Sequence, residues 1–137
     1  MRAIWVIRFY FYKLIGRASG WKGYIGRPKF VKGLKNIYFG KNFRIFPDSR
    51  IESLGNGRII FGDNCVIGHN LFITCSEKDI EIGSECIFSA NIFFGTQKND
   101  FLNISSDSNW FKENITEHSI KIGNKCFIGH GAVILPG

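Results

Sequence analysis

The chain has 137 residues, of which 45% are hydrophobic and 21% charged, so it is long enough for one folded domain and too apolar for a disordered chain. Its net charge of +7 is uneven: residues 1–47 hold eleven Lys and Arg and no acid, whereas residues 48–137 hold seven basic and eleven acidic residues, a net charge of −4. No recognised nucleic-acid-binding motif accompanies the basic region, so we expect no nucleic-acid partner.

The segment 1–36 is basic and aromatic and begins with MRAIWVIRFYFYKLIGR. Arg8 and Lys13 interrupt its apolar residues, which leaves no uncharged run long enough to span a bilayer and makes it a poor secretory signal. Two interpretations stay open. The segment is a helix whose aromatic side chains pack against the body of the protein, or residues 1–35 contact the inner-membrane surface with Trp and Tyr among the headgroups and Lys and Arg facing anionic lipid.

From residue 37 to residue 137 a large apolar residue, mostly followed by a small or polar one, recurs every six residues. We name these large residues the anchors; they fall into four groups of three: Phe39, Ile45, Ile51; Phe61, Ile67, Ile73; Ile82, Phe88, Phe94; Ile122, Ile128, Ile134. The residues two positions earlier are usually smaller and include Phe43, Ser49, Cys65, Leu71, Cys86, Ile92, Cys126 and Ala132. Residues two apart in an extended chain point to the same side, so both sets face inward. The period predicts a parallel β-helix whose stacked coils bury a column of anchors.

The four cysteines fit this repeat. Cys65, Cys86 and Cys126 occupy the same inward position in successive coils, so we interpret them as core residues. Cys75 falls near a coil corner. Because no C-x-x-C spacing and no secretory leader occur, we expect reduced thiols in a cytoplasmic protein and no metal site.

The stretches IIFGDNCVIGHNLFI, IEIGSECIFSANIFF and IKIGNKCFIGHGAVILPG resemble the left-handed β-helix of hexapeptide-repeat acyltransferases, above all the branch that O-acetylates sugars of bacterial surface polysaccharides. The resemblance implies an all-β, left-handed parallel β-helix that assembles as a homotrimer. It implies transfer of an acetyl group from acetyl-CoA to a hydroxyl of a saccharide or lipid-linked saccharide. It also implies that acyl-CoA lies in the groove between adjacent helices, and we assign Gly131 and Ala132 of the last repeat to its binding.

Residues 95–119 interrupt the repeat as a long loop, and the resemblance implies that this loop carries a histidine acting as the base. Gln97 and Asn99 stand where the family has two histidines, and neither side chain can act as a base near neutral pH. His118, beside Glu117 at the end of the loop, is the candidate catalytic base, oriented by that carboxylate. The loop residues Phe101, Trp110, Phe111 and Ile115 would hold it against the body.

Two other functions stay open. The missing histidine pair favours a non-catalytic β-helix, either a scaffold or a pseudoenzyme. IGHGAVILPG also resembles γ-class carbonic anhydrases, in which two histidines five apart bind a metal ion; His130 matches the first and Leu135 occupies the second, which leaves too few ligands. His69 and His130 are therefore interpreted as solvated corner residues.

The repeat stops within a coil at Gly137, where the column of anchors would lie uncovered. We interpret this ending as a truncation, which together with the missing histidines would leave the enzyme inactive.

Overall fold

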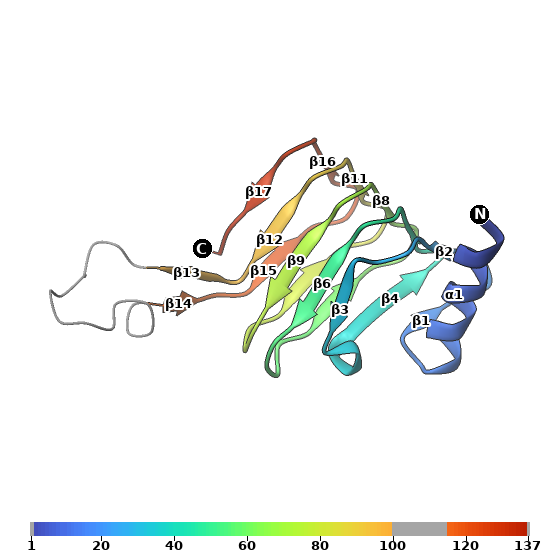
Figure 1. Cartoon of the computed structure of the whole chain (residues 1–137). Coiled ribbons are helices and arrows are strands. Elements are labelled where there is room, and N and C mark those ends of the chain that lie inside the picture. Colours follow the sequence, from blue (N-terminus) through green and yellow to red (C-terminus); the bar gives the residue numbers. More distant parts are fainter. Residues whose placement is uncertain (1, 100–114, 137) are drawn as a thin grey trace, which may run out of the picture.

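The computed structural model shows a parallel β-helix preceded by the α-helix α1 (Arg2–Leu14) (Figure 1). It describes residues 2–99 and 115–136. The predicted all-β, left-handed parallel β-helix is confirmed. The chain winds through three parallel sheets of five strands each and visits them in the same order in every coil, because each six-residue phrase supplies one short strand and one corner.

We number the sheets in the order in which the chain reaches them. Sheet 1 contains β1 (Ala18–Ser19), β4 (Ile37–Lys41), β7 (Ile59–Phe61), β10 (Ile80–Ile82) and β15 (Ile120–Ile122). Sheet 2 contains β2 (Tyr24–Ile25), β5 (Arg44–Ile45), β8 (Val66–Ile67), β11 (Ile87–Phe88) and β16 (Phe127–Ile128). Sheet 3 contains β3 (Phe30–Lys32), β6 (Arg50–Ser53), β9 (Phe72–Cys75), β12 (Phe93–Gly95) and β17 (Val133–Ile134).

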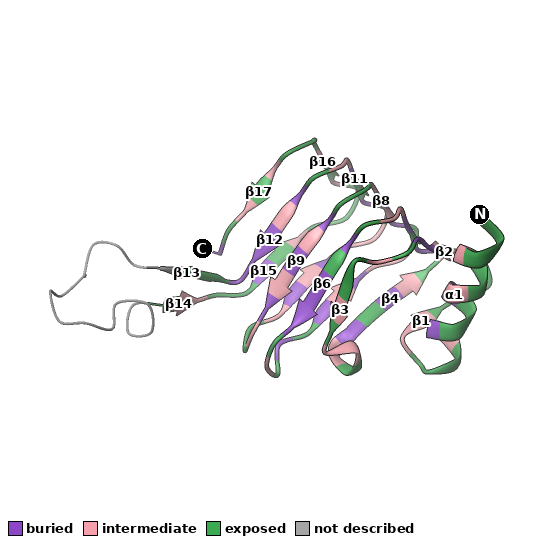
Figure 2. Cartoon of the chain, in the orientation of Figure 1, coloured by how far each residue is buried: buried purple, intermediate pink, exposed green. Residues whose placement is uncertain are grey.

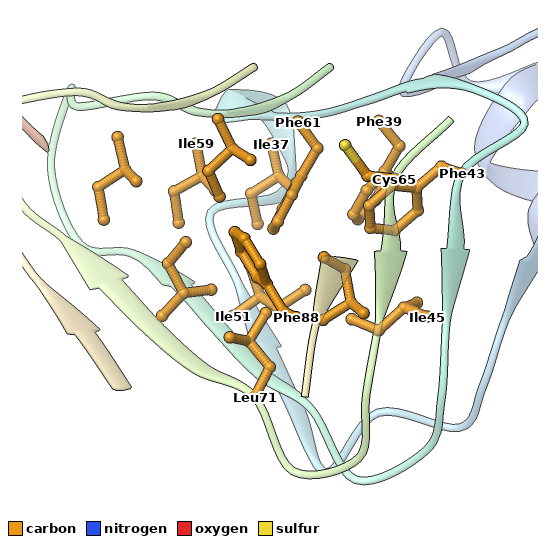
Figure 3. Packing of buried hydrophobic residues seen from close by; sticks show 14 of the residues in the cluster. Ile37, Phe39, Phe43, Ile45, Ile51, Ile59, Phe61, Cys65, Leu71 and Phe88 are labelled. Atoms are coloured by element: carbon orange, nitrogen blue, oxygen red, sulfur yellow. The ribbon is translucent and has the colours of Figure 1, made fainter. Parts of the chain in front are cut away.

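The core is a column of anchors enclosed by the three sheets (Figures 2 and 3). The register stacks like on like, so that Ile37, Ile59 and Ile80 are direct neighbours in sheet 1, and the Phe61 ring stacks on that of Phe39 with centroids 5.6 Å apart. The anchors of the first three groups are all buried, whereas those of the last group are only partly buried. The predicted inward orientation of the anchors is therefore confirmed.

The helix α1 covers the first coil. Phe9 and Tyr12 are buried, the Tyr12 ring contacts that of Phe39 at 5.6 Å, and the Arg8 guanidinium donates to the Ile25 carbonyl at 2.8 Å. The strands β1 to β3 come from the segment 1–36, so the coils begin before residue 37, where the sequence pattern becomes visible. The first coil keeps the six-residue spacing, with Ile25 and Val31 paired to the anchors Ile45 and Ile51, but small Ala18 stands opposite the anchor Phe39. Among the described residues no helix is long and apolar enough to cross a bilayer.

Each coil turns at three corners. The first corner joins sheet 1 to sheet 2, the second joins sheet 2 to sheet 3, and the third joins sheet 3 to the next strand of sheet 1. The first two corners repeat regularly and place a residue with positive φ in successive coils, such as Asn42 (55°) and Asn64 (57°) at the first, and Asn70 (58°) and Asn91 (59°) at the second. Asparagine tolerates this left-handed conformation, and its amide can bond to the coil above.

A short η1 turn (Leu34–Asn36) lies at the third corner, between β3 and β4. At this corner the connections differ from coil to coil, and the last one carries the strands β13 (Gln97–Asn99) and β14 (Ile115–Glu117), which leave the three sheets. Figure 1 shows this hairpin projecting from the side of the coils, far from α1.

Candidate functional site

The loop predicted over residues 95–119 begins as an antiparallel pair at the third corner. Gln97 lies opposite Glu117 and Asn99 opposite Ile115 in the β13–β14 ladder. Ile115 is exposed, so this residue does not hold the loop against the body as expected; Phe101, Trp110 and Phe111 lie outside the described residues. The base of the loop is held instead by polar contacts around Glu117.

The Glu117 carboxylate fastens the end of the loop to the corner of the preceding coil. Its Oε1 accepts hydrogen bonds from the backbone N–H groups of Ser76, Glu77 and Lys78, at 3.0, 2.9 and 3.1 Å, and from the hydroxyl of Thr96 at 2.7 Å. Burial of the carboxyl favours its neutral form, but the Thr96 hydroxyl and the three amides outweigh that effect, and the pKa of Glu117 lies below its usual value. We call this arrangement the Glu117 clamp.

The clamp changes the expected role of Glu117. The sequence predicts that this carboxylate orients His118, but its Oε1 is occupied by the Thr96 hydroxyl and the corner amides. Thr96 is fully buried, and its carbonyl accepts a hydrogen bond of 3.1 Å from the His118 backbone N–H. Glu117 therefore fixes the backbone from which His118 projects, rather than the imidazole ring itself.

His118 lies at the surface of the third corner, immediately after β14 and two residues before β15, with an exposed side chain. Gln97, at the position where the family has its first histidine, follows Thr96 directly and is also exposed. The backbone contact between Thr96 and His118 thus brings the loop's remaining histidine close to the place where the usual one is missing. No sequence pattern pointed to Thr96, whose role depends on a partner 21 positions away.

A second polar pair lies beside His118 at the same corner. The Arg58 Nη2 lies 2.6 Å from Asp79 Oδ2, and the Arg58 backbone N–H donates to Asp79 Oδ1 at 2.7 Å. Hydrogen bonds from Arg58 keep the pKa of Asp79 below its usual value. The Asp79 carbonyl accepts from the Ile120 backbone N–H at 3.0 Å, which places this pair next to the residues that follow His118.

A shallow hollow of about 410 Å³ continues from this pair over the outer face of sheet 1. Its lining includes the charged side chains Arg58, Glu81 and Lys121. Lys121 is three residues beyond His118, a distance of roughly 10 Å along an extended chain. Ile60, Ile82 and Ile122 also line it, so the hollow combines apolar surface with a few charged groups of both signs.

Gly131 and Ala132 lie at the second corner, between β16 and β17. Gly131 has φ 74° and donates to the Ala90 carbonyl at 3.1 Å, while the Ala132 carbonyl accepts from the Phe93 N–H at 3.0 Å. A side chain at Gly131 would meet nothing within 4 Å, so its surface is open, whereas the Ala132 side chain packs against the core. Ala132 is partly buried, so it offers less surface to a ligand than Gly131.

One chain does not bring the two predicted sets of site residues together. Gly131 and Ala132 bond to residues that precede β12 or begin it, whereas His118 bonds to Thr96, just beyond the end of β12. The three residues of β12 separate the two sets by roughly 10 Å.

The other histidines lie at the second corner and are exposed, in agreement with their interpretation as corner residues. His130 Nε2 is 3.3 Å from Asn91 Nδ2, and the His69 ring is 5.0 Å from that of Phe46. In the part of the chain that the structure describes, no three His, Cys, Asp or Glu side chains gather as they would around a metal ion.

All four cysteines are free thiols. Cys65 and Cys86 are buried in the core as predicted, Cys126 is partly buried against it, and Cys75, which the sequence places near a corner, is buried as well. The Sγ atoms of Cys65 and Cys86 lie 3.2 and 3.1 Å from the carbonyls of Gly83 and Gly123 in the next coil. Burial raises the pKa of the Cys65 thiol to about 11 and that of Cys75, also buried, to about 11. These thiols stay protonated near neutral pH and are poor nucleophiles.

Comparisons with known proteins agree with the repeat and the fold. The family model for the hexapeptide repeat of succinyl-transferase matches residues 59–75. The putative lipopolysaccharide biosynthesis O-acetyl transferase WbbJ of Escherichia coli (strain K12) is 24% identical over 115 residues, which cover 80% of this chain and 58% of WbbJ. The chain thus spans less than two thirds of that relative's length.

A solved structure shares the architecture. AntD, an N-acyltransferase from Bacillus cereus in complex with dTDP and 3-hydroxybutyryl-CoA, superposes with a TM-score of 0.75 at 21% identity, covering 93% of this chain and 68% of AntD. The fold and the repeat define a hexapeptide-repeat β-helix protein. The predicted resemblance to hexapeptide-repeat acyltransferases is confirmed, and both of these relatives are named as acyltransferases.

Proposed function

We propose that this protein transfers an acyl group, in the simplest case acetyl, from acyl-CoA to a sugar hydroxyl during surface-polysaccharide biosynthesis in the cytoplasm. The observation that carries the proposal is the third corner, where the Glu117 clamp holds the end of the interrupting loop and His118 is presented on a fixed backbone. The similarity to an O-acetyl transferase of lipopolysaccharide biosynthesis supports the same reaction class.

In this proposal the imidazole of His118 accepts the proton of the sugar hydroxyl. The hydroxyl oxygen attacks the thioester carbonyl carbon, the carbon–sulfur bond then breaks, and CoA leaves with the proton that His118 returns to its sulfur. A positioned base of this kind contributes about 10² to 10⁴ in rate. The hollow lined by Arg58, Glu81 and Lys121 would receive the saccharide.

We further propose that the site is completed in a homotrimer. The separation of Gly131 and Ala132 from His118 in one chain supports this, because a neighbouring copy can bring its second corner to the His118 of the first. The outer face of sheet 3 offers a surface for such packing: Phe72 and Phe93 are edge to face at 5.0 Å, and Arg50 lies over the Phe72 ring at 4.8 Å. Phe30 and Val133, at the two ends of the same row, are exposed.

The direct test is an assay of the purified chain with acetyl-CoA and a lipid-linked saccharide, in which free CoA and acetylated saccharide are both measured. We expect equal amounts of the two products and binding of acetyl-CoA by calorimetry. A folded trimer that binds acetyl-CoA but acetylates no saccharide would restrict the proposal to CoA binding.

A non-catalytic β-helix is the second candidate, favoured by Gln97 at the usual histidine position. It predicts a folded assembly that does not bind acetyl-CoA at all. The same calorimetric titration therefore separates the two candidates.

A further inference from the structure

The helix α1 has two apolar faces. Its inner face packs on the first two coils: the Trp5 ring contacts that of Tyr24 at 5.7 Å and that of Phe46 at 6.2 Å, and Phe9 and Tyr12 are buried. These contacts account for half of the helix and confirm the interpretation of the segment as a packed helix. They leave the opposite side of α1 to be explained.

The opposite side carries a continuous apolar row, which we call the outer stripe. Its side chains are largely exposed, at 59% for Ile4, 67% for Ile7, 55% for Phe11 and 86% for Leu14. Their spacing of three, four and three residues places them on one face of the helix, and no charged residue interrupts that face. Figure 2 shows α1 as mostly exposed along its length. No segment that the structure describes covers the stripe.

The segment that contains the outer stripe is basic, and the first carboxylate of the chain is Asp48. At 3.6 residues per turn Arg2 and Lys13 lie on the side of α1 away from the stripe. The turn after α1 is tied to the helix, because Tyr10 Oη donates to the Trp21 carbonyl at 2.8 Å and Lys13 Nζ lies 3.5 Å above the Trp21 ring. Trp21 itself is 78% exposed.

We propose that the outer stripe docks the protein on an anionic lipid surface, with α1 lying flat in the interface and Trp21 among the headgroups. An uninterrupted apolar face on a helix whose Lys and Arg lie on its other side is the pattern that such interfacial helices share. With 13 residues α1 is about 20 Å long, too short to cross the hydrocarbon core and sufficient to lie along it. The excess of Lys and Arg in residues 1–47 would attract this segment to the lipid phosphates.

Charge distinguishes a lipid surface from a second copy of the chain as the partner. Two copies joined through their stripes would bring together two segments that each hold eleven basic residues and no acid over residues 1–47. Like charges in such an interface repel, whereas an anionic membrane attracts the whole segment. The docking does not depend on the proposed transfer reaction.

The test is flotation of the full chain with vesicles of phosphatidylglycerol and phosphatidylcholine in equal parts, compared with vesicles of phosphatidylcholine alone. We expect the protein to float with the anionic vesicles and largely not with the neutral ones. The double variant Ile7→Gln, Leu14→Gln should lower the partition coefficient by about tenfold or more, because it removes two side chains that would be buried in lipid. Glutamine keeps the helix propensity, and both residues are exposed, so the fold should persist.

The matched control is the double variant Ile87→Gln, Phe127→Gln, which removes two exposed apolar side chains that are neighbours on sheet 2. It should float like the wild type. Lys22→Gln with Arg2→Gln should weaken binding to anionic vesicles and leave the weak binding to neutral ones unchanged. Three results would overturn the proposal: no preference for anionic vesicles, equal loss in the control variant, or a fall in oligomeric mass without lipid when Ile7 and Leu14 are replaced, which would make the stripe a contact between copies.

Discussion

The first two corners and the third corner of the β-helix turn the same chain by different means. At the first two, backbone geometry repeats from coil to coil, with positive φ at Asn42 and Asn64 and glycines so closely stacked that a Cβ on Gly62 would lie 2.6 Å from the Gly83 backbone. At the third, the connections vary, and a single carboxylate, Glu117, holds two of them together.

This difference between the corners distinguishes the residues that stack one coil on the next from those that project from the coils. A regular corner must fit its neighbours above and below, so its residues are set by sterics and by amide ladders such as Asn70 to Asn91, 2.7 Å apart. Glycines also pack closely at the third corner, where a Cβ on Gly57 would lie 2.5 Å from the Lys78 carbonyl oxygen, but the connections there differ in length from coil to coil. This corner can therefore carry an insertion with polar groups. In this protein it carries the Glu117 clamp, His118 and the Arg58–Asp79 pair.

Breaking the glycine stack should have the largest effect on stability. Gly62→Ala pushes a methyl group against the Gly83 backbone, and overpacking of this kind costs about 2–3 kcal/mol in the free energy of unfolding. Gly129→Ala is the matched control, because a Cβ there meets nothing within 4 Å and its cost should be near zero. Urea denaturation of both variants measures the difference; equal costs would show that close stacking does not set the corner.

Breaking the amide ladder should have an intermediate effect. Asn91 has a φ of 59°, which asparagine tolerates better than alanine, and its side chain accepts a hydrogen bond from Asn70. Asn91→Ala loses both advantages, and we expect the free energy of unfolding to fall by about 1–2 kcal/mol. Asn91→Gly relieves the backbone strain and should recover about half of that loss. Urea denaturation measures the free energy of unfolding of both variants. If the two values are equal, backbone strain does not contribute to the loss of stability in Asn91→Ala.

Breaking the clamp should have a smaller and local effect. Glu117→Gln weakens the bonds to the amides of residues 76–78, and for this partly exposed group we expect a loss of about 1 kcal/mol. Hydrogen exchange should speed up at those amides and at His118. Glu85→Gln is the control, because the exposed Glu85 carboxylate makes a single long ion pair, of 3.8 Å, with Lys125. Unchanged exchange at residues 76–78 would contradict the clamp.

The pH dependence of stability should give the smallest signal. The folded-state pKa values of Glu117 and Asp79 lie below the usual 4.5 and 3.8, so their ionised forms stabilise the fold at pH values above these. That contribution is lost as the pH falls through the folded-state values. Glu117→Gln should therefore flatten the decline in unfolding free energy below about pH 5 in an acid titration. A wild-type decline that survives this substitution unchanged would exclude Glu117 as its source.

The sequence predicted the parts of the fold that repeat. The six-residue period predicts the buried anchors, such as Ile67 and Phe88, and the buried cysteines Cys65 and Cys86. It does so because every coil buries side chains at the same positions. The first coil was missed although Ile25 and Val31 keep the spacing, because Ala18 stands where the next coil has the large anchor Phe39.

The candidate site was only partly predictable. His118 could be singled out by its place at the end of the insertion, but the bonds that Glu117 makes beside it could not. The Glu117 carboxylate accepts hydrogen bonds from a corner about 40 residues earlier in the chain, and no local sequence pattern predicts such a contact. Thr96 was missed for the same reason.

The contrast between the corners is tested most directly by comparing the two exposed histidines that they carry. The measurement is kcat/KM for acetyl transfer from acetyl-CoA to a lipid-linked saccharide in the wild type, His118→Ala and His130→Ala. We predict a fall of about 10² to 10⁴ for His118→Ala and nearly wild-type activity for His130→Ala. Full activity in His118→Ala, or an equal fall in both variants, would contradict the assignment of the chemistry to the third corner.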